Sequence, residues 1–259
     1  MAQVRPKKHL GQHFLKDLEV ARRIAESLEL SEPSCVLEIG PGTGVLSQFL
    51  LQNNNINLTA VEVDKESVEY LKNNFPTLKV IEADFLKIDV KSIFPEQFII
   101  IGNFPYNISS QIFFKVLENR DSVRQVVCMI QKEVAERMAA AHGNKTYGIL
   151  SVLMQAFYSI DYLFTVHEHV FDPPPKVKSA VIRLTRNNVN SLGCDEQLFK
   201  TVVKTAFNQR RKTLRNSLKP VVGKENSMYA NSLFDKRPEQ LSVSAFIELT
   251  NMVEAALKN

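Results

Sequence analysis

The sequence Val-Leu-Glu-Ile-Gly-Pro-Gly-Thr-Gly occupies residues 36–44 and joins a short apolar segment to a run of glycines. The apolar segment 35–39 predicts a buried strand, and residues 45–51 after the glycines predict a helix. Glycine has no Cβ, so this backbone can turn sharply and approach a ligand closely. The order of strand, glycine loop and helix predicts a nucleotide-binding turn, although its G-x-G-x-G spacing differs from that of dinucleotide-binding turns.

Outward from this turn, the chain alternates predicted strands with predicted helices. The further strands are expected at 58–63, 79–82, 98–101 and 126–130. Such alternation predicts an α/β domain whose parallel sheet is covered by helices. Two later strands, 162–170 and 180–184, are joined by a turn around Pro173-Pro174-Pro175 that is too short for a crossover helix, so they should pair antiparallel.

The two ends of the chain read as helical. Apolar residues recur at helical spacing over 14–30, and residues 132–141 predict a helix after the fifth strand. The polar stretch 187–193 is a plausible linker, and the chain beyond residue 195 carries helical signals that end at 245–257. We therefore predict one domain over 1–186 and a small helical, RNA-binding domain over 187–259.

The charge of the chain is unevenly distributed. The formal net charge is +4, and residues 187–259 carry 11 Lys and Arg against 7 Asp and Glu, so the rest of the chain is balanced. A regional basic excess suits a polyanion-binding surface. The run 207–215 predicts a helix with four cations for phosphate contacts, namely Arg210, Arg211, Lys212 and Arg215.

Composition excludes several classes of protein. Apolar residues make up 44% of the 259 positions, enough for a full core, and no stretch approaches the roughly 20 apolar residues of a membrane span. The basic start of the chain is not followed by the apolar run of a secretory signal. The cysteines, Cys35, Cys128 and Cys194, are far apart and form no metal-type pair. These features predict a cytoplasmic protein with reduced thiols.

Two acidic residues follow successive strands and favour a nucleoside site. Glu62 ends the second strand, where a carboxylate can accept hydrogen bonds from both ribose hydroxyls. Asp84 follows the third strand, where it can accept from the amino group of a cofactor adenine. Because NAD enzymes use the same ribose contact, these residues indicate a nucleoside but not yet a methyl donor.

The segment Asn103-Phe104-Pro105-Tyr106 after the fourth strand indicates the chemistry. The amino nitrogen of adenine is a poor nucleophile because its lone pair is delocalised into the ring. The Asn103 side-chain carbonyl and the Pro105 backbone carbonyl can orient that amine, and Tyr106 offers a face for base stacking. Positioning and electrostatics would carry such a methyl transfer without a metal or a covalent nucleophile. His9 and His13 stand four apart, but no third metal ligand is apparent.

Motifs along nearly the whole chain resemble the KsgA/RsmA family of small-subunit (16S) ribosomal RNA adenine N6,N6-dimethyltransferases. The resemblance implies a Rossmann-like class I methyltransferase domain with a mixed seven-stranded sheet, plus a small all-helical C-terminal domain. The matching segments are Lys8–Leu15, the glycine loop 36–44, Glu62, Asp84, residues 103–106, residues 171–177 (FDPPPKV) and the basic run 207–215.

The resemblance also implies a reaction and its partners. Methyl groups would pass from S-adenosylmethionine, without a metal, to N6 of two adjacent adenosines in the 3′-terminal hairpin of 16S rRNA. The partner would be 16S rRNA in a pre-30S particle, bound by a monomer. Positions expected to frame the target base are Asn103, Pro105, Tyr106 and Phe171. Those expected to contact the methyl donor are His13, Leu15, Gly40, Gly42, Glu62, Val63, Asp84, Phe85 and Asn103.

Three residues depart from the family pattern. His13 replaces a usual asparagine, Phe104 a common leucine, and Lys178 a frequent aspartate. An imidazole at position 13 can still form hydrogen bonds, although its protonated form would repel a sulfonium. Lys178 would alter a local ion pair.

Three other functions remain open at this stage. A 23S rRNA adenine methyltransferase of the macrolide-resistance type would share the glycine loop and the 103–106 segment, although the 171–177 segment favours the small-subunit enzyme. A non-catalytic ribosome-assembly factor is opposed by the intact 103–106 segment. DNA adenine methylation is a third, weaker alternative.

Overall fold

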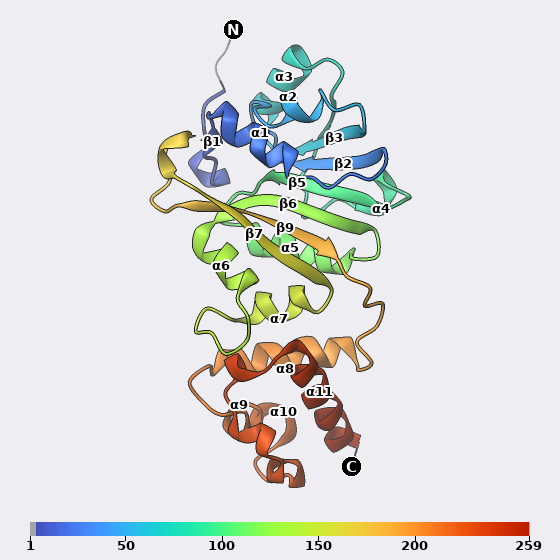
Figure 1. Ribbon diagram of the computed structural model, residues 1–259, viewed down its shortest axis with the longest axis vertical. Coiled ribbons are helices and arrows are strands. Elements are labelled where there is room, and N and C mark those ends of the chain that lie inside the picture. Colours follow the sequence, from blue (N-terminus) through green and yellow to red (C-terminus); the bar gives the residue numbers. More distant parts are fainter. Residues whose placement is uncertain (1–3, 259) are drawn as a thin grey trace. The chain divides into compact units, whose positions relative to one another are not determined.

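The computed structural model describes residues 4–258, which form two compact units (Figure 1). The first unit comprises the chain up to Ala135 together with Ile160–Arg186. The second unit comprises Glu136–Ser159 and the chain from Asn187 onward. This division differs from the expected boundary in one respect, because residues 136–159 group with the C-terminal helices.

The first unit is built on a mixed seven-stranded sheet with the order β4-β3-β2-β5-β6-β9-β7. The pairs β2–β3, β3–β4, β2–β5 and β5–β6 are parallel, whereas β9 pairs antiparallel with β6. This confirms the predicted mixed sheet. The strands are β2 (Ser34–Ile39), β3 (Ile56–Glu62), β4 (Lys79–Glu82), β5 (Phe98–Asn103), β6 (Val123–Gln131), β7 (Tyr158–Val166) and β9 (Ser179–Arg186).

The central strands are continuous apolar runs because they are covered on both faces. Residues 98–101 of β5 are at most 1% exposed. The α-helices that follow the strands are short. They are α1 (Leu18–Glu26), α2 (Ser47–Leu50), α3 (Lys65–Asn74), α4 (Val90–Ile93), α5 (Ser109–Glu118) and α6 (Lys132–Ala139), which ends in the second unit.

The sequence predicts one helix over 14–30, but the N-terminal segment does not form one. The 3₁₀ turn Lys8–Leu10 leads to a two-residue strand, β1 (Phe14–Leu15), which pairs antiparallel with β8 (Phe171–Asp172). Helix α1 begins only after Asp17, whose side chain accepts a hydrogen bond from the Val20 amide and so caps the helix. The strand exists because of a partner far away in the chain, which helical periodicity cannot reveal.

The second unit is helical. Its longest helices, α8 (Glu196–Asn208) and α11 (Val243–Lys258), bring Phe207 and Phe246 into a stack with ring centroids 5.9 Å apart. The other elements are α7 (Ile149–Gln155), α9 (Leu214–Ser217), α10 (Lys219–Val222) and the 3₁₀ turns Ser227–Ala230, Ser232–Asp235 and Pro238–Gln240. In the first unit, a further 3₁₀ turn, Glu168–Val170, precedes β8.

The predicted helix over 207–215 is wrong. Helix α8 ends at Asn208, where Gln209 leaves the helical region with φ −118° and ψ 46°, and α9 begins at Leu214. The cations at 210–212 therefore lie on a turn. Separately, none of the helices formed by residues 4–258 combines the length and apolar character needed to span a bilayer.

Candidate active site

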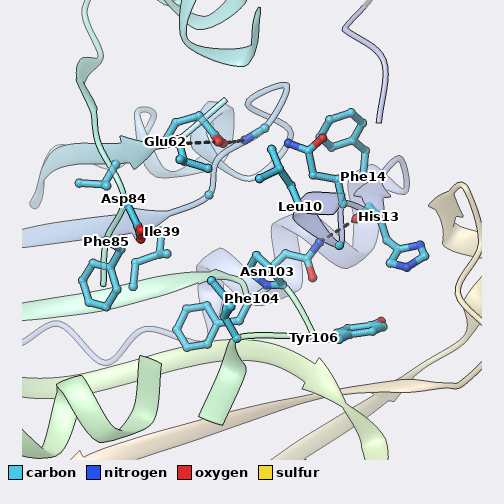
Figure 2. A pocket seen from close by; sticks show the side chains of 18 of the residues that line it. Leu10, His13, Phe14, Ile39, Glu62, Asp84, Phe85, Asn103, Phe104 and Tyr106 are labelled. Atoms are coloured by element: carbon cyan, nitrogen blue, oxygen red, sulfur yellow. Dashed lines mark hydrogen bonds between the residues drawn. The ribbon is translucent and has the colours of Figure 1, made fainter. Parts of the chain in front are cut away.

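A cavity of about 710 Å³ opens where neighbouring parallel strands end (Figure 2). Gly40 follows β2, Glu62 ends β3, Asp84 follows β4 and Asn103 ends β5. These four strands are parallel neighbours in the order β4-β3-β2-β5, so their carboxyl ends meet at one edge of the sheet. All four of these predicted residues line the cavity.

Glu62 is a buried carboxylate that the backbone holds in place. It accepts hydrogen bonds from the amides of Gly42 (3.1 Å), Val63 (2.8 Å) and Asp64 (2.9 Å). Burial raises the pKa of Glu62, and these backbone hydrogen bonds counteract part of that rise. A carboxylate has about four acceptor positions, so after three amides it retains capacity for a ligand hydroxyl.

The glycine loop takes backbone conformations that require glycine. Gly42 has φ +56°, and a Cβ on it would lie 2.9 Å from the Phe14 ring. Gly40 has φ +66°, and a Cβ there would meet nothing within 4 Å. The Gly40 backbone therefore borders open space in the cavity, where a ligand can approach.

Glu38 lies next to this loop but does not line the main cavity. It is 1% exposed and accepts a 2.6 Å hydrogen bond from the Ser47 hydroxyl. Burial raises the pKa of this carboxyl group to about 8. A smaller hollow of about 380 Å³, which Glu38 and Leu15 line, shares Gly40, Gly42 and Asn103 with the main cavity.

The far end of the cavity is partly apolar. The Asp84 carboxylate caps its own turn by accepting from the Leu86 amide at 2.9 Å. Phe85 is buried, whereas Val63 is 49% exposed. Both residues line the cavity. A carboxylate next to apolar surface matches the needs of a purine ring with an exocyclic amine.

Asn103 is oriented by the N-terminal segment. Its side-chain amide nitrogen donates a 3.0 Å hydrogen bond to the His13 carbonyl (Figure 2). The amide oxygen is therefore the end of the side chain that remains as an acceptor for a ligand. The Pro105 carbonyl already accepts from the Ile108 amide at 3.2 Å and keeps its second lone pair.

Tyr106 is half-buried at the same end of the cavity. Its hydroxyl forms a 2.5 Å hydrogen bond with the Ser179 hydroxyl, and burial raises its pKa. Phe104, by contrast, is 1% exposed and packs against Phe113 at a centroid distance of 5.9 Å. Both aromatic residues of the 103–106 segment line the cavity, but Phe104 is also packed into the core, whereas Tyr106 keeps part of its ring exposed.

Phe171 is not brought to this cavity. It is 1% exposed and belongs to the apolar core of the first unit, together with Leu15. The cavity instead has lining residues that sequence reasoning did not assign, and these include Leu10, Gln12, Phe14, Ile39 and Ala83. Leu10, Gln12 and Phe14 belong to segment 8–15, which is one of the segments that resemble the family. That resemblance is the sequence signal by which they could have been assigned to the site.

The predicted phosphate-binding cations lie in the second unit and differ in their contacts. Arg210 donates to the Lys145 carbonyl, and Arg215 forms a 2.6 Å ion pair with Asp235. Arg211 and Lys212 are exposed on the turn after α8. Among residues 4–258, no group of three or more His, Cys, Asp or Glu residues is placed to hold a metal ion.

Comparison with known proteins agrees with this geometry. The profile of the family described as "Ribosomal RNA adenine dimethylase" matches residues 3–254. The Ribosomal RNA small subunit methyltransferase A of Parabacteroides distasonis is 64% identical over 252 residues, which cover 96% of this chain and 94% of the relative.

Two solved structures share the fold. A dimethyladenosine transferase from Plasmodium falciparum has a TM-score of 0.79 at 24% identity, with 94% of this chain and 98% of that chain covered. The 23S rRNA methyltransferase ErmE has a TM-score of 0.69 at 26% identity, with 92% and 99% covered. The chain belongs to the ribosomal RNA adenine dimethylase family and is a methyltransferase of that family.

Proposed function

We propose that this enzyme dimethylates N6 of two adjacent adenosines in the 3′-terminal hairpin of 16S rRNA, with S-adenosylmethionine as the methyl donor. The orientation of Asn103 is the observation that carries the proposal. Its amide nitrogen is engaged by the His13 carbonyl, so its oxygen is available to a target amine.

The residues present fit the donor. Glu62 retains acceptor capacity for a ribose hydroxyl, Asp84 and Phe85 suit the adenine, and the Gly40 backbone borders open space. S-adenosylmethionine supplies an electrophilic methyl group on a sulfonium.

The protein's contribution to the transfer is positional. In the first of the two transfers, Asn103 Oδ1 and the Pro105 carbonyl accept from the two N–H groups of the adenine amine, which directs the nitrogen lone pair toward the methyl carbon. A nitrogen–carbon bond forms as the sulfur–carbon bond breaks. The nitrogen proton becomes acidic on alkylation and leaves to solvent, and Tyr106 supports the extruded base by stacking.

The proposal also covers the binding partner and the roles of the two domains. A monomer would act in the cytoplasm on a pre-30S particle, with residues 1–186 binding the donor and the target base. Residues 187–259 would contact RNA phosphates through Arg210, Arg211, Lys212 and Arg215. The name of the 64% identical relative supports a small-subunit substrate over 23S rRNA, since the ErmE structure is only 26% identical.

The test is Asn103→Ala, assayed with tritiated donor and undermethylated 30S particles. We expect loss of methyl transfer while the variant remains folded, as thermal denaturation can check. Asn74→Ala is the matched control, because Asn74 also donates its side-chain amide to a carbonyl, that of Tyr70, at an exposed helix end. Full activity of Asn103→Ala would remove the mechanism, and methylation of 23S rRNA in preference to 30S particles would favour the macrolide-resistance type of enzyme.

A further inference from the structure

The imidazole of His13 makes contacts at the Tyr106 end of the cavity. Its Nδ1 lies 2.7 Å from the Pro173 carbonyl oxygen, and its ring stacks on Tyr106 with centroids 5.5 Å apart and an interplanar angle of 27°. From these contacts we propose that the His13 side chain is a positioning residue for the target adenine rather than a ligand of the methyl donor. The inference rests on the proposed adenine methylation.

The hydrogen bond to Pro173 fixes the direction of the ring. A carbonyl oxygen can only accept, so Nδ1 is the nitrogen that carries the proton in this contact. The Pro173 carbonyl follows β8, which pairs residue by residue with β1 next to His13. Backbone pairing and the side-chain bond therefore hold residues 13–15 and 171–173 together at the same place.

The stack with Tyr106 defines a boundary for the base. An offset stack covers part of an aromatic face and leaves part of it free. The Tyr106 ring is held at its other end by the hydrogen bond to Ser179. A purine that stacks on the remaining surface is bounded by the imidazole, which limits how far it can slide away from Asn103.

The donor contacts lie elsewhere. In Figure 2 the His13 imidazole lies beside Tyr106 at one end of the view, whereas Glu62, Asp84 and Phe85 lie toward the other end. The link from His13 to Asn103 uses the His13 backbone carbonyl. Truncation of the side chain to alanine therefore removes the Pro173 and Tyr106 contacts and leaves the Asn103 hydrogen bond available.

Two variants separate the two contacts. His13→Phe keeps a ring to stack on Tyr106 but cannot donate to Pro173, and His13→Ala loses both contacts. His9→Ala is the matched control, since His9 is an exposed histidine in the same N-terminal segment. Glu62→Gln serves as the reference for weakened donor binding, because Glu62 is placed to hold the ribose.

The measurements are the dissociation constant of S-adenosylhomocysteine by calorimetry, and the single-turnover rate with undermethylated 30S particles at saturating donor. We expect His13→Ala to lose about 10- to 100-fold in transfer rate because the base is misplaced, with ligand affinity within about twofold of wild type, and His13→Phe to lie in between. Wild-type enzyme that fails to methylate 30S particles would refute the proposed function itself.

Other results would refute only the role of His13. One is weaker S-adenosylhomocysteine binding in His13→Ala, comparable to that of Glu62→Gln, whatever happens to the transfer rate. The other is an unchanged transfer rate and unchanged affinity in an active enzyme.

Discussion

The hydroxyl oxygens of Tyr106 and Ser179 lie 2.5 Å apart and share a hydrogen bond. Ser179 is fully buried and begins β9, whereas Tyr106 follows β5, so the bond joins two separate segments at the target-base end of the cavity. The pKa of Tyr106 is raised by burial, which keeps its phenol protonated near neutral pH. A protonated phenol can remain the donor in this bond.

Ser179→Ala should slow methyl transfer by roughly threefold to tenfold, since a typical hydrogen bond contributes about 1 kcal/mol. Tyr106→Phe removes the same bond from the other side and should have a similar effect. Because both changes remove one interaction, the double variant should be no slower than either single variant. Single-turnover assays test this, and fully additive losses would show that the bond does not position the ring.

Glu38 should make the folded state less stable as the pH rises. Its folded pKa is raised to about 8 by burial, from the model-compound value of 4.5. Between these values the folded state binds a proton that the unfolded state has released, so stability falls as pH increases through this window. Glu62 has a pKa raised in the same direction and adds to the slope.

Glu38→Gln tests this linkage, because the amide cannot ionise and its oxygen can still accept from Ser47. The variant should melt higher than wild type at pH 8.5, by an amount equivalent to a few kcal/mol, and the advantage should shrink toward pH 5. Thermal denaturation across this pH range measures the effect, with the exposed Glu69→Gln as control. An advantage that does not vary with pH would contradict the assignment.

Gly102→Ala should damage the site through the backbone. A Cβ at this position would lie 2.5 Å from the carbonyl oxygen of Ile39, so β2 and β5 would have to separate next to Gly40 and Asn103. We expect destabilisation of about 1–3 kcal/mol and a loss of transfer activity. Gly148→Ala is the control, since its Cβ would make only ordinary van der Waals contacts, with the flexible Arg137 side chain at 3.5 Å and the Thr146 carbonyl oxygen at 3.9 Å. Equal activity of the two variants would contradict the prediction.

Arg211 and Lys212 should contribute to RNA affinity mainly through electrostatics. Both are exposed, whereas Arg215 is already paired with Asp235. Each alanine substitution should weaken RNA binding and reduce the slope of log affinity against log salt by about one unit. Filter binding at several salt concentrations measures this, with the exposed Lys224→Ala as control. Unchanged slopes would place the RNA contacts elsewhere.

The sheet and most of the cavity were predictable because their signals are local. Central strands are continuous apolar runs, and the residues that follow them are polar or glycine at the edge where parallel strands end. Gly40, Glu62, Asp84 and Asn103 could thus be placed together from the order of strands alone. The direction of the Asn103 amide could not, because it depends on the His13 carbonyl, which lies 90 residues away.

The differences between these expectations and the structure share a cause. Strand β1 has two residues and no periodicity, so only its pairing with β8 defines it. Phe171 was expected at the base but is buried in the core, since β8 turns it inward. The basic run resembled a helix by composition, yet α8 ends at Asn208. Each outcome depends on tertiary contacts between residues distant in sequence.

The pairing of β1 with β8 has a consequence for substrate affinity. Phe14 touches the glycine loop at Gly42 and pairs with Asp172, directly before the Pro173 carbonyl that His13 contacts. A nucleoside bound in the cavity should thus restrict residues 13–15 and 171–173, which hold the His13 ring against Tyr106. Because such coupling is reciprocal, the factor by which S-adenosylhomocysteine raises the affinity for RNA must equal the factor by which RNA raises the affinity for S-adenosylhomocysteine.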